Sequence, residues 1–179
     1  MNEQTRTRIE SAIKPMKDLA LWHAHRAADL QVFWLGPPVQ RVSWDSKVQT
    51  VGQFSLHIQC AWRIRSGDRI LVGYRDVFVT EDDTEGDKTA TGSNRQPITR
   101  RDFLLESLIN ERADPLRVNR VDVDDLAGLS LLLDEGLVLE IFPDASGDDA
   151  HSESWRFFEQ NSERHLVIMG STALFDGWD

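Results

Sequence analysis

Three polar side chains that could take part in binding or catalysis lie two and four residues apart within residues 51–64. They are His57, Gln59 and Arg63. Side chains two or four residues apart in a strand point to the same face, so these three would lie together. An imidazole supplies a base near neutral pH, and a guanidinium binds carboxylate or phosphate. If another element covers this face, it forms a ligand-binding or catalytic pocket. If none does, it is the solvent-exposed side of an antiparallel sheet, and both interpretations stay open.

Two tryptophans, Trp34 and Trp44, flank the sequence Gly36-Pro37-Pro38. Aromatic rings beside prolines are typical of grooves that bind a small ligand or a peptide. Packing in the core or at its rim is the alternative. Trp34 and Trp44 are therefore candidate ligand-binding residues together with His57, Gln59 and Arg63.

The single cysteine, Cys60, alternates in phase with Ile58 and Trp62. A reactive thiolate needs partial exposure and a positive neighbourhood, whereas free cysteines are commonly buried. The pattern therefore predicts a buried, inert thiol. We assign no catalytic residue, because the sequence also lacks a phosphate-binding glycine loop, a nucleophile elbow and a His-Glu-x-x-His motif.

Metal binding is not predicted either. His23 and His25 fall within a segment that we expect to be helical, where residues two apart are about 200° apart around the axis. His151 lies among four acidic residues, but these lack the spacing and the glycine of a calcium loop. We expect no metal and no cofactor.

The net charge of −10 is concentrated in the last third of the chain. Residues 121–179 contain 14 acidic and 2 basic residues, a net −12. Such a segment repels nucleic acid and attracts a basic protein partner. The candidate partner-binding residues are Asp144, Asp148, Asp149 and Glu153. The alternative is that these acidic residues only keep the domain soluble.

The elements that must position these residues begin with residues 51–64, whose strict alternation predicts a strand with one buried face. The predicted organisation is a single domain over 1–179. It comprises a helical N-terminal segment (1–30) interrupted near Pro15, a first β segment (31–80), a mobile loop (81–98), a helix (99–113) and a second β segment (116–170).

Two hairpins are specific enough to test. After residues 51–64 the chain turns near 66–68, and a three-residue loop would bring Ile70, Val72, Tyr74 and Phe78 to the apolar face. A two-residue loop at Gly67-Asp68 is the less favoured alternative. The second hairpin joins 129–133 to 137–142, with Gly136 in the left-handed conformation. It pairs Leu129 with Ile141, Leu131 with Leu139 and Leu133 with Leu137.

The predicted class is α+β: an antiparallel sheet, strongly curved or in two parts, with N-terminal helices and one central helix. One cysteine and no N-terminal apolar run indicate a cytoplasmic location, and no segment is long and apolar enough for a membrane span.

Three strings, Leu56-His-Ile-Gln-Cys-Ala-Trp-Arg63, Leu139-Glu-Ile-Phe-Pro-Asp-Ala145 and Glu153-Ser-Trp-Arg-Phe157, resemble a pattern found in uncharacterised bacterial proteins. The C-terminal part also resembles small domains that occur beside bacterial toxin–immunity loci. The resemblance implies a bacterial, cytoplasmic, non-catalytic domain and supplies no site residues. We therefore expect a protein-interaction module, immunity-like in character, with a basic protein partner. The alternatives are a ligand-binding or catalytic domain built on the polar face of 51–64, and self-association as a homodimer.

Overall fold

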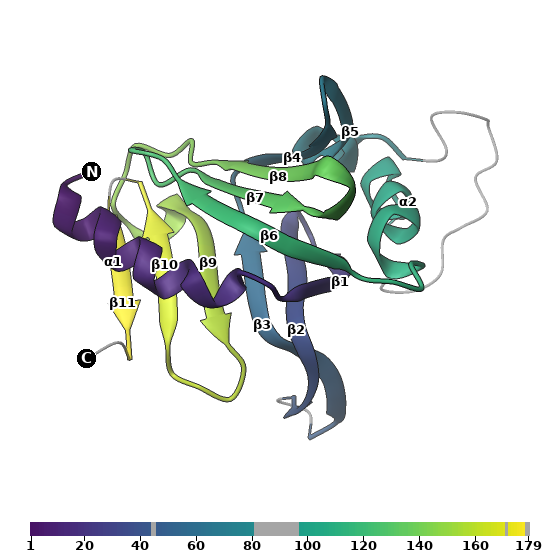
Figure 1. Cartoon of the computed structure of the whole chain (residues 1–179), viewed down its shortest axis with the longest axis horizontal. Helices are drawn as coiled ribbons and strands as arrows, with labels where there is room; N and C mark the ends of the chain where they lie inside the picture. Colours follow the sequence, from purple (N-terminus) through teal and green to yellow (C-terminus); the bar gives the residue numbers. More distant parts are fainter. Residues whose placement is uncertain (44–45, 81–96, 171, 178–179) are drawn as a thin grey trace.

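A computed structural model describes residues 1–43, 46–80, 97–170 and 172–177. These residues form an α+β fold dominated by an antiparallel sheet that does not close on itself (Figure 1). The α+β class and the antiparallel sheet are thereby confirmed. The strands are β1 (Ala20–Ala27), β2 (Leu30–Val42), β3 (Val48–Ile58), β4 (Ala61–Ser66), β5 (Arg69–Gly73), β6 (Leu116–Val123), β7 (Leu129–Leu133), β8 (Leu137–Phe142), β9 (Glu153–Glu159), β10 (His165–Met169) and β11 (Thr172–Asp176).

The strand order is β11-β10-β9-β3-β2-β1-β6-β7-β8-β4-β5. The first six strands and the last five meet only where β1 pairs with β6, through Ala20 with Arg117 and Leu21 with Leu116. Figure 1 shows β6, β7, β8 and β4 running across the direction of β2, β3, β9 and β10. The sheet therefore presents two sets of strands whose apolar faces can pack together.

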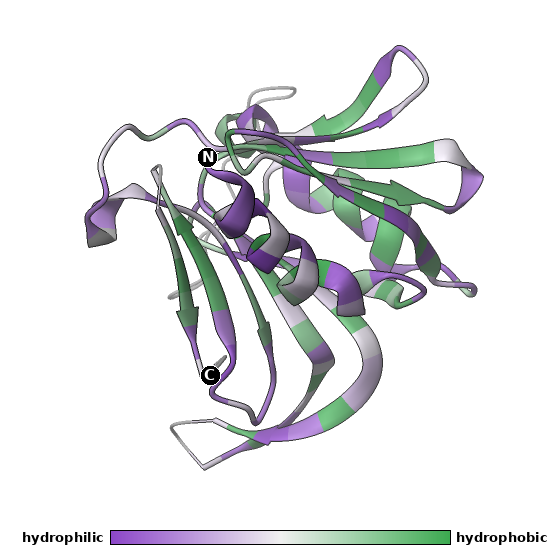
Figure 2. Ribbon diagram, turned by 60° about the vertical axis from the view of Figure 1, so that its left-hand side comes forward, coloured by the Kyte–Doolittle hydropathy of each residue, from purple (hydrophilic) through white to green (hydrophobic). Residues whose placement is uncertain are grey.

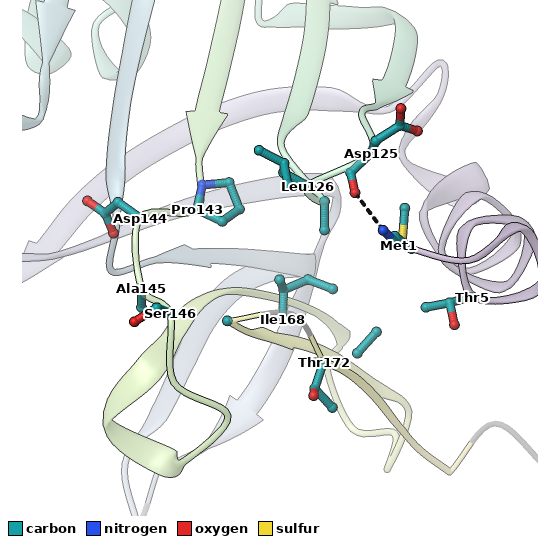
Figure 3. Close-up of a pocket in the computed structure, with 13 residues that line it drawn as sticks. Met1, Thr5, Asp125, Leu126, Pro143, Asp144, Ala145, Ser146, Ile168 and Thr172 are labelled. Atoms are coloured by element: carbon teal, nitrogen blue, oxygen red, sulfur yellow. Dashed lines mark hydrogen bonds between the residues drawn. The ribbon is translucent and has the colours of Figure 1, made fainter.

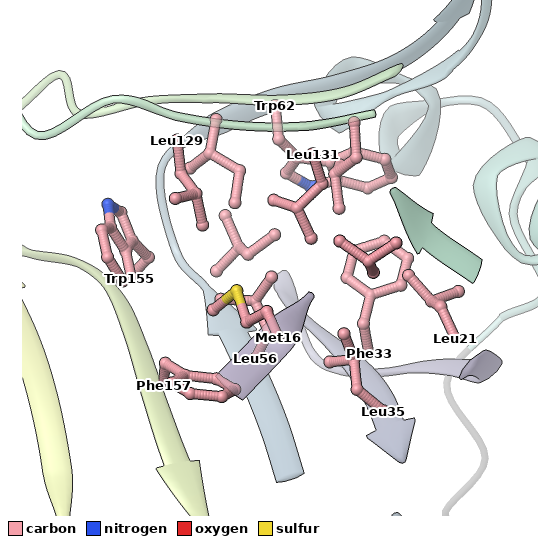
Figure 4. Close-up of a cluster of buried hydrophobic side chains, with 14 of the residues drawn as sticks. Met16, Leu21, Phe33, Leu35, Leu56, Trp62, Leu129, Leu131, Trp155 and Phe157 are labelled. Atoms are coloured by element: carbon pink, nitrogen blue, oxygen red, sulfur yellow. The ribbon is translucent and has the colours of Figure 1, made fainter. Parts of the chain in front are cut away.

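The hydrophobic core lies between these two sets of strands. Figure 4 shows Leu129, Leu131 and Trp62 from one set facing Leu56 and Phe157 from the other. All five side chains are almost completely buried. Burial of one such side chain stabilises the fold by about 1.5–3 kcal/mol, so this layer supplies most of the force that joins the two sets.

The first helix, α1 (Glu3–Ile13), begins where Asn2 accepts a hydrogen bond from the Thr5 amide, as an N-cap does. Its apolar stripe buries Ile9 and Ile13, and Figure 2 shows the helix lying beside the gap between the two sets of strands. A short 3₁₀ helix (Lys14–Met16) with Pro15 in its first turn ends the helical segment.

The prediction of helix up to residue 30 is wrong, because residues 20–27 form strand β1. Asp18 has a left-handed backbone (φ 66°), which ends the helical run. Ala24 then pairs with Phe33, and His25 pairs with Val32. A bulge between Leu21 and His23 places the buried residues Leu21 and Ala24 three apart, a spacing that a helix also shows. Pairing with distant strands decides between the two structures.

The predicted strand over residues 51–64 is divided into β3 and β4. Its apolar side is buried as expected at Leu56, Ile58 and Ile64. The strand is interrupted at Gln59 and Cys60. Before the interruption β3 pairs with β2 and β9, and after it β4 pairs with β5 and β8. The one segment thus contributes to both sets of strands.

The hairpin between β4 and β5 has a two-residue turn, with Ser66 paired to Arg69, so the favoured three-residue loop is wrong. A bulge after Ile64 then shifts the register and places Val72 opposite Ile64, where it is fully buried. Ile70 is exposed, as is Phe78, which lies in a 3₁₀ helix (Tyr74–Phe78) rather than in the expected strand. The bulge supplies the one-residue shift in register that the shorter turn lacks. The alternation of apolar and polar residues does not predict such a bulge.

The hairpin of β7 and β8 is confirmed. Leu129 pairs with Ile141, Leu131 pairs with Leu139, and Gly136 has φ 71°. At the start of the predicted first β segment, residues 30–42 form the long strand β2, with an irregularity between Leu35 and Pro38.

Residues 100–110 are helical, as α2 (Arg100–Leu105) followed by one π-helical turn (Glu106–Asn110). Thr99 is the N-cap and forms a capping box with Asp102, which confirms the predicted start. The loop predicted over 81–98 lies mostly outside the described residues. No helix within the described parts of the chain is both long and apolar enough to cross a membrane.

Candidate functional site

The structure does not bring His57, Gln59 and Arg63 into one site. His57 lies on β3, and Gln59 is exposed at the break that follows it. Arg63 lies on β4, where its Nε donates to Glu140 of β8 at 2.6 Å. The division of the 51–64 segment therefore separates the predicted base from the predicted cation.

Arg63 and Arg65 both form ion pairs with Glu140, at 2.6 and 3.1 Å. Burial raises the pKa of the Glu140 carboxyl, but the hydrogen bonds and charges of the two arginines outweigh this and lower it. These residues join β4 to β8 and have a structural role.

A pocket does form beside Gly36-Pro37-Pro38, but with a tryptophan other than the predicted pair. Trp22 donates its indole N–H to the Gly36 carbonyl at 2.8 Å. It lines an apolar pocket of about 480 Å³ with Pro37 and Pro38. Trp34 is not part of the pocket lining, although its ring centroid is 5.4 Å from that of Trp22. Trp44 lies outside the described residues.

Four of the five histidines of the chain lie on one face of the first set of strands, which we term the imidazole face. Strand pairing aligns two neighbouring rows of side chains on this face. One row is His23, Trp34, Ser55, Phe158 and His165, and the other is His25, Val32, His57, Arg156 and Val167. Of the predicted ligand-binding residues, His57 and Trp34 thus lie on one face, together with His23, His25 and Arg156.

The histidines of the imidazole face are held in the neutral form. Burial, followed by the charge of Arg156, lowers the pKa of His57 to about 4. Burial and the neighbouring His23 lower the pKa of His25 to about 4. The His57 ring also meets Phe158 edge-on, 4.9 Å between centroids. At neutral pH these rings act as polar, uncharged aromatic groups.

The acidic residues singled out in the sequence divide into two kinds. Asp144, Asp148 and Asp149 are exposed on the loop between β8 and β9. The Glu153 carboxylate is largely buried and accepts from Arg156 Nε at 2.6 Å. Glu153 therefore belongs to the imidazole face and not to an acidic surface.

Much of the remaining acidic charge of the last third is paired with arginines from earlier in the sequence. Asp125 pairs with Arg6 at 2.6 Å, and Glu135 pairs with Arg112. The uneven charge of the sequence is thus partly balanced in the fold, and the loop between β8 and β9 keeps three exposed acidic residues within residues 144–149.

A pocket of about 320 Å³ borders this acidic loop (Figure 3). We term it the acidic-rimmed pocket: Leu126, Pro143, Ile168 and Ala173 supply apolar lining, and Asp125 and Asp144 lie on its rim. Leu126 is 75% exposed. An apolar pocket with exposed acidic residues beside it is a typical arrangement for binding a protein partner.

The turn that carries Leu126 is held rigidly. The Asp124 carboxylate accepts from the backbone amides of Leu126 and Gly128, at 2.8 and 2.7 Å. The buried Trp155 donates its indole N–H to the Ala127 carbonyl at 2.8 Å. On the other side, Gly170 donates to the Ser152 carbonyl at 3.2 Å. The pocket is therefore largely preformed, which reduces the entropy lost on binding.

Cys60 is 2% exposed, as predicted, and burial raises the pKa of its thiol to about 12. Within the described residues, no group of three or more His, Cys, Asp or Glu side chains is arranged to hold a metal ion. No family model, no curated protein and no solved structure matches the chain.

Proposed function

We propose that this chain is a non-catalytic, cytoplasmic protein-interaction module, immunity-like in character, that binds a basic segment of a partner protein at the acidic-rimmed pocket. The observation that carries the proposal is that the exposed side chain of Leu126 and the exposed carboxylate of Asp144 line one pocket. Asp148 and Asp149 are exposed on the same loop as Asp144. A lysine- or arginine-rich segment with one large apolar residue would complement this combination in shape and charge.

The two parts of the surface contribute differently to binding. Burial of Leu126 against the partner supplies about 25 cal/mol for each Å² of apolar surface removed from water. The carboxylates mainly accelerate association and select against acidic partners, because charges on an exposed rim are screened. Salt should therefore weaken binding by slowing association more than by speeding dissociation.

A defined peptide library, selected for binding to the full chain, tests the proposal. We expect enriched peptides that combine Lys or Arg with Leu, Ile or Phe. Leu126→Ser and the double variant Asp144→Lys/Asp149→Lys should each weaken binding at least about tenfold. The matched control is Glu163→Lys, an exposed acidic residue remote from the pocket lining.

Enriched peptides without basic residues, or equal binding by the wild type and the double variant, would refute the proposal. Light scattering at several concentrations separates peptide binding from self-association, the homodimer alternative. A dimer that is lost in Leu126→Ser would assign the pocket to a second copy of the chain instead.

A further inference from the structure

A third pocket, of about 330 Å³, lies at the edge of β1 and is independent of the proposed function. Its lining comes from His23, His25 and Arg26 of β1 and from Asp102, Leu105 and Glu106 of the helical segment 100–110. Polar groups of several kinds converge here over an apolar base, which is the usual composition of a small-molecule site.

The pocket forms because most of β1 has no strand beside it on the side where β6 pairs with its start. β1 pairs with β6 only at Ala20 and Leu21, so its edge is open over the following residues. The helical segment 100–110 packs against this edge. Asn110 bonds the Ala24 backbone at 2.7 and 2.9 Å and donates to the Glu106 carboxylate at 2.7 Å. The π-helical turn that holds Glu106 and Asn110 is a feature often found at functional sites.

The charges within the pocket leave one carboxylate in excess. Arg26 Nε lies 2.8 and 2.9 Å from the two carboxylate oxygens of Asp102, and these opposite charges cancel. Burial lowers the pKa of both His23 and His25, so both rings are neutral at pH 7. The Glu106 side chain then gives the lining a net charge of −1. Its bond to Asn110 is with a neutral amide, and among the described residues it forms no ion pair.

Two imidazole rings, those of His23 and His25, line the same pocket as the Glu106 carboxylate. The His23 ring lies 4.4 Å from the Trp34 ring and 5.3 Å from the His25 ring, measured between centroids. The carboxylate and the two imidazole rings of the lining therefore face a common space. A carboxylate next to π faces is the arrangement that binds an organic ammonium group.

We propose that the β1 pocket binds a small primary or secondary ammonium compound with a flat apolar body. The ammonium group donates to the Glu106 carboxylate, and the body packs against the His23 ring and Leu105. An anionic ligand would meet Glu106 without a compensating cation, because Arg26 is engaged by Asp102. The pocket volume admits a ligand of about a dozen non-hydrogen atoms and not a folded partner.

The test uses three probes of similar shape with the ¹⁵N-labelled full chain: 2-phenylethylammonium, 2-phenylethanol and 3-phenylpropionate. We expect the ammonium probe to shift the amide resonances of Ala24, Glu106 and Asn110 in a saturable manner. The neutral alcohol and the carboxylate should bind at least about tenfold more weakly, the effect of losing one charge-assisted hydrogen bond.

Glu106→Gln keeps the acceptor for Asn110 and removes the charge, so the ammonium probe should lose about tenfold in affinity. Glu111→Gln, an exposed carboxylate at the end of the same helical segment, is the matched control and should change nothing. Equal affinities for the ammonium and the alcohol, an unchanged affinity in Glu106→Gln, or no shift at the three amides with millimolar probe would each overturn the proposal.

Discussion

The side-chain amide of Asn110 replaces a neighbouring strand for Ala24. Its Oδ1 accepts from the Ala24 N–H at 2.7 Å, and its Nδ2 donates to the Ala24 carbonyl at 2.9 Å. Two antiparallel strands exchange the same pair of bonds. The amide therefore satisfies the edge of β1 where β6 has already diverged, and it protects that edge from pairing with another chain.

Asn110→Ala should lower the free energy of unfolding by about 1–3 kcal/mol, because both backbone groups of Ala24 lose their partner. Urea denaturation of the full chain measures this difference. Ser107→Ala on the same helical segment, where the hydroxyl is exposed, is the control and should change stability by less than about 0.5 kcal/mol. Equal losses in the two variants would show that the amide bonds contribute nothing.

The folded chain should lose stability on acidification between about pH 6.5 and pH 4. The pKa values of His25 and His57 are about 4 in the folded chain, below the usual 6.5 that they regain on unfolding. Within this window the unfolded chain binds more protons, so the free energy of unfolding falls as the pH falls. Each ring contributes roughly 2–3 kcal/mol to this loss, and neither contributes above pH 6.5.

Urea denaturation at several pH values measures the slope, and NMR titration of the imidazole protons assigns it. His57→Gln should flatten the pH dependence and leave a remaining loss that comes mainly from His25, with smaller contributions from His23 and His165, whose pKa values burial also lowers. Midpoints near 6.5 for His25 and His57 in the native spectrum would contradict this prediction.

The elements that the sequence predicted well are those whose partners are adjacent in the chain. The β7–β8 hairpin requires only Leu129–Leu133, a turn with Gly136, and Leu137–Phe142. The Thr99 cap likewise needs only Asp102, three residues later. In both cases the interactions that form the element are made between residues close together in the sequence. The local sequence pattern therefore predicts the structure correctly.

Strand β1 and its pocket could not be predicted in this way. The helical interpretation placed His23 and His25 on opposite sides of a helix, whereas the strand places both rings on one face, 5.3 Å apart. The partners that make this segment a strand are β2 and the start of β6, the latter nearly a hundred residues away. The alternation of His23, Ala24, His25 and Arg26 was the available signal, and it was weaker than the helical spacing around it.

Arg101 offers a test of how much a buried charge costs this fold. Its side chain is fully buried, and its Nε and Nη1 lack hydrogen-bond partners among the described residues. Within the described parts of the chain, its Nη2 donates to the Asp29 carbonyl at 3.2 Å. Burial lowers its pKa, which indicates that the charged form is held at a cost.

Arg101→Met should therefore leave stability unchanged or raise it by about 1 kcal/mol, as replacement of a buried ionic group by an apolar one of similar volume often does. Arg101→Ala removes the same charge but leaves a cavity, and should destabilise the chain by about 2 kcal/mol or more. Urea denaturation distinguishes the two. A large loss of stability in Arg101→Met would show that the guanidinium makes a necessary interaction.

Gly52 lies where β2 and β3 approach closely, next to the irregularity that separates Leu35 from Pro38. A Cβ atom at Gly52 would lie 2.7 Å from Trp34 Cβ and 2.8 Å from the Leu35 amide nitrogen. Neither atom can yield without moving the backbone of β2, so Gly52→Ala should cost about 1–3 kcal/mol. Gln49→Ala, at an exposed position of the same strand, is the control for urea denaturation. Because Trp34 belongs to the imidazole face, Gly52→Ala should also shift the NMR signals of His23 and His25. A variant as stable as Gln49→Ala, with unchanged imidazole signals, would mean that the two strands are farther apart than the structure places them.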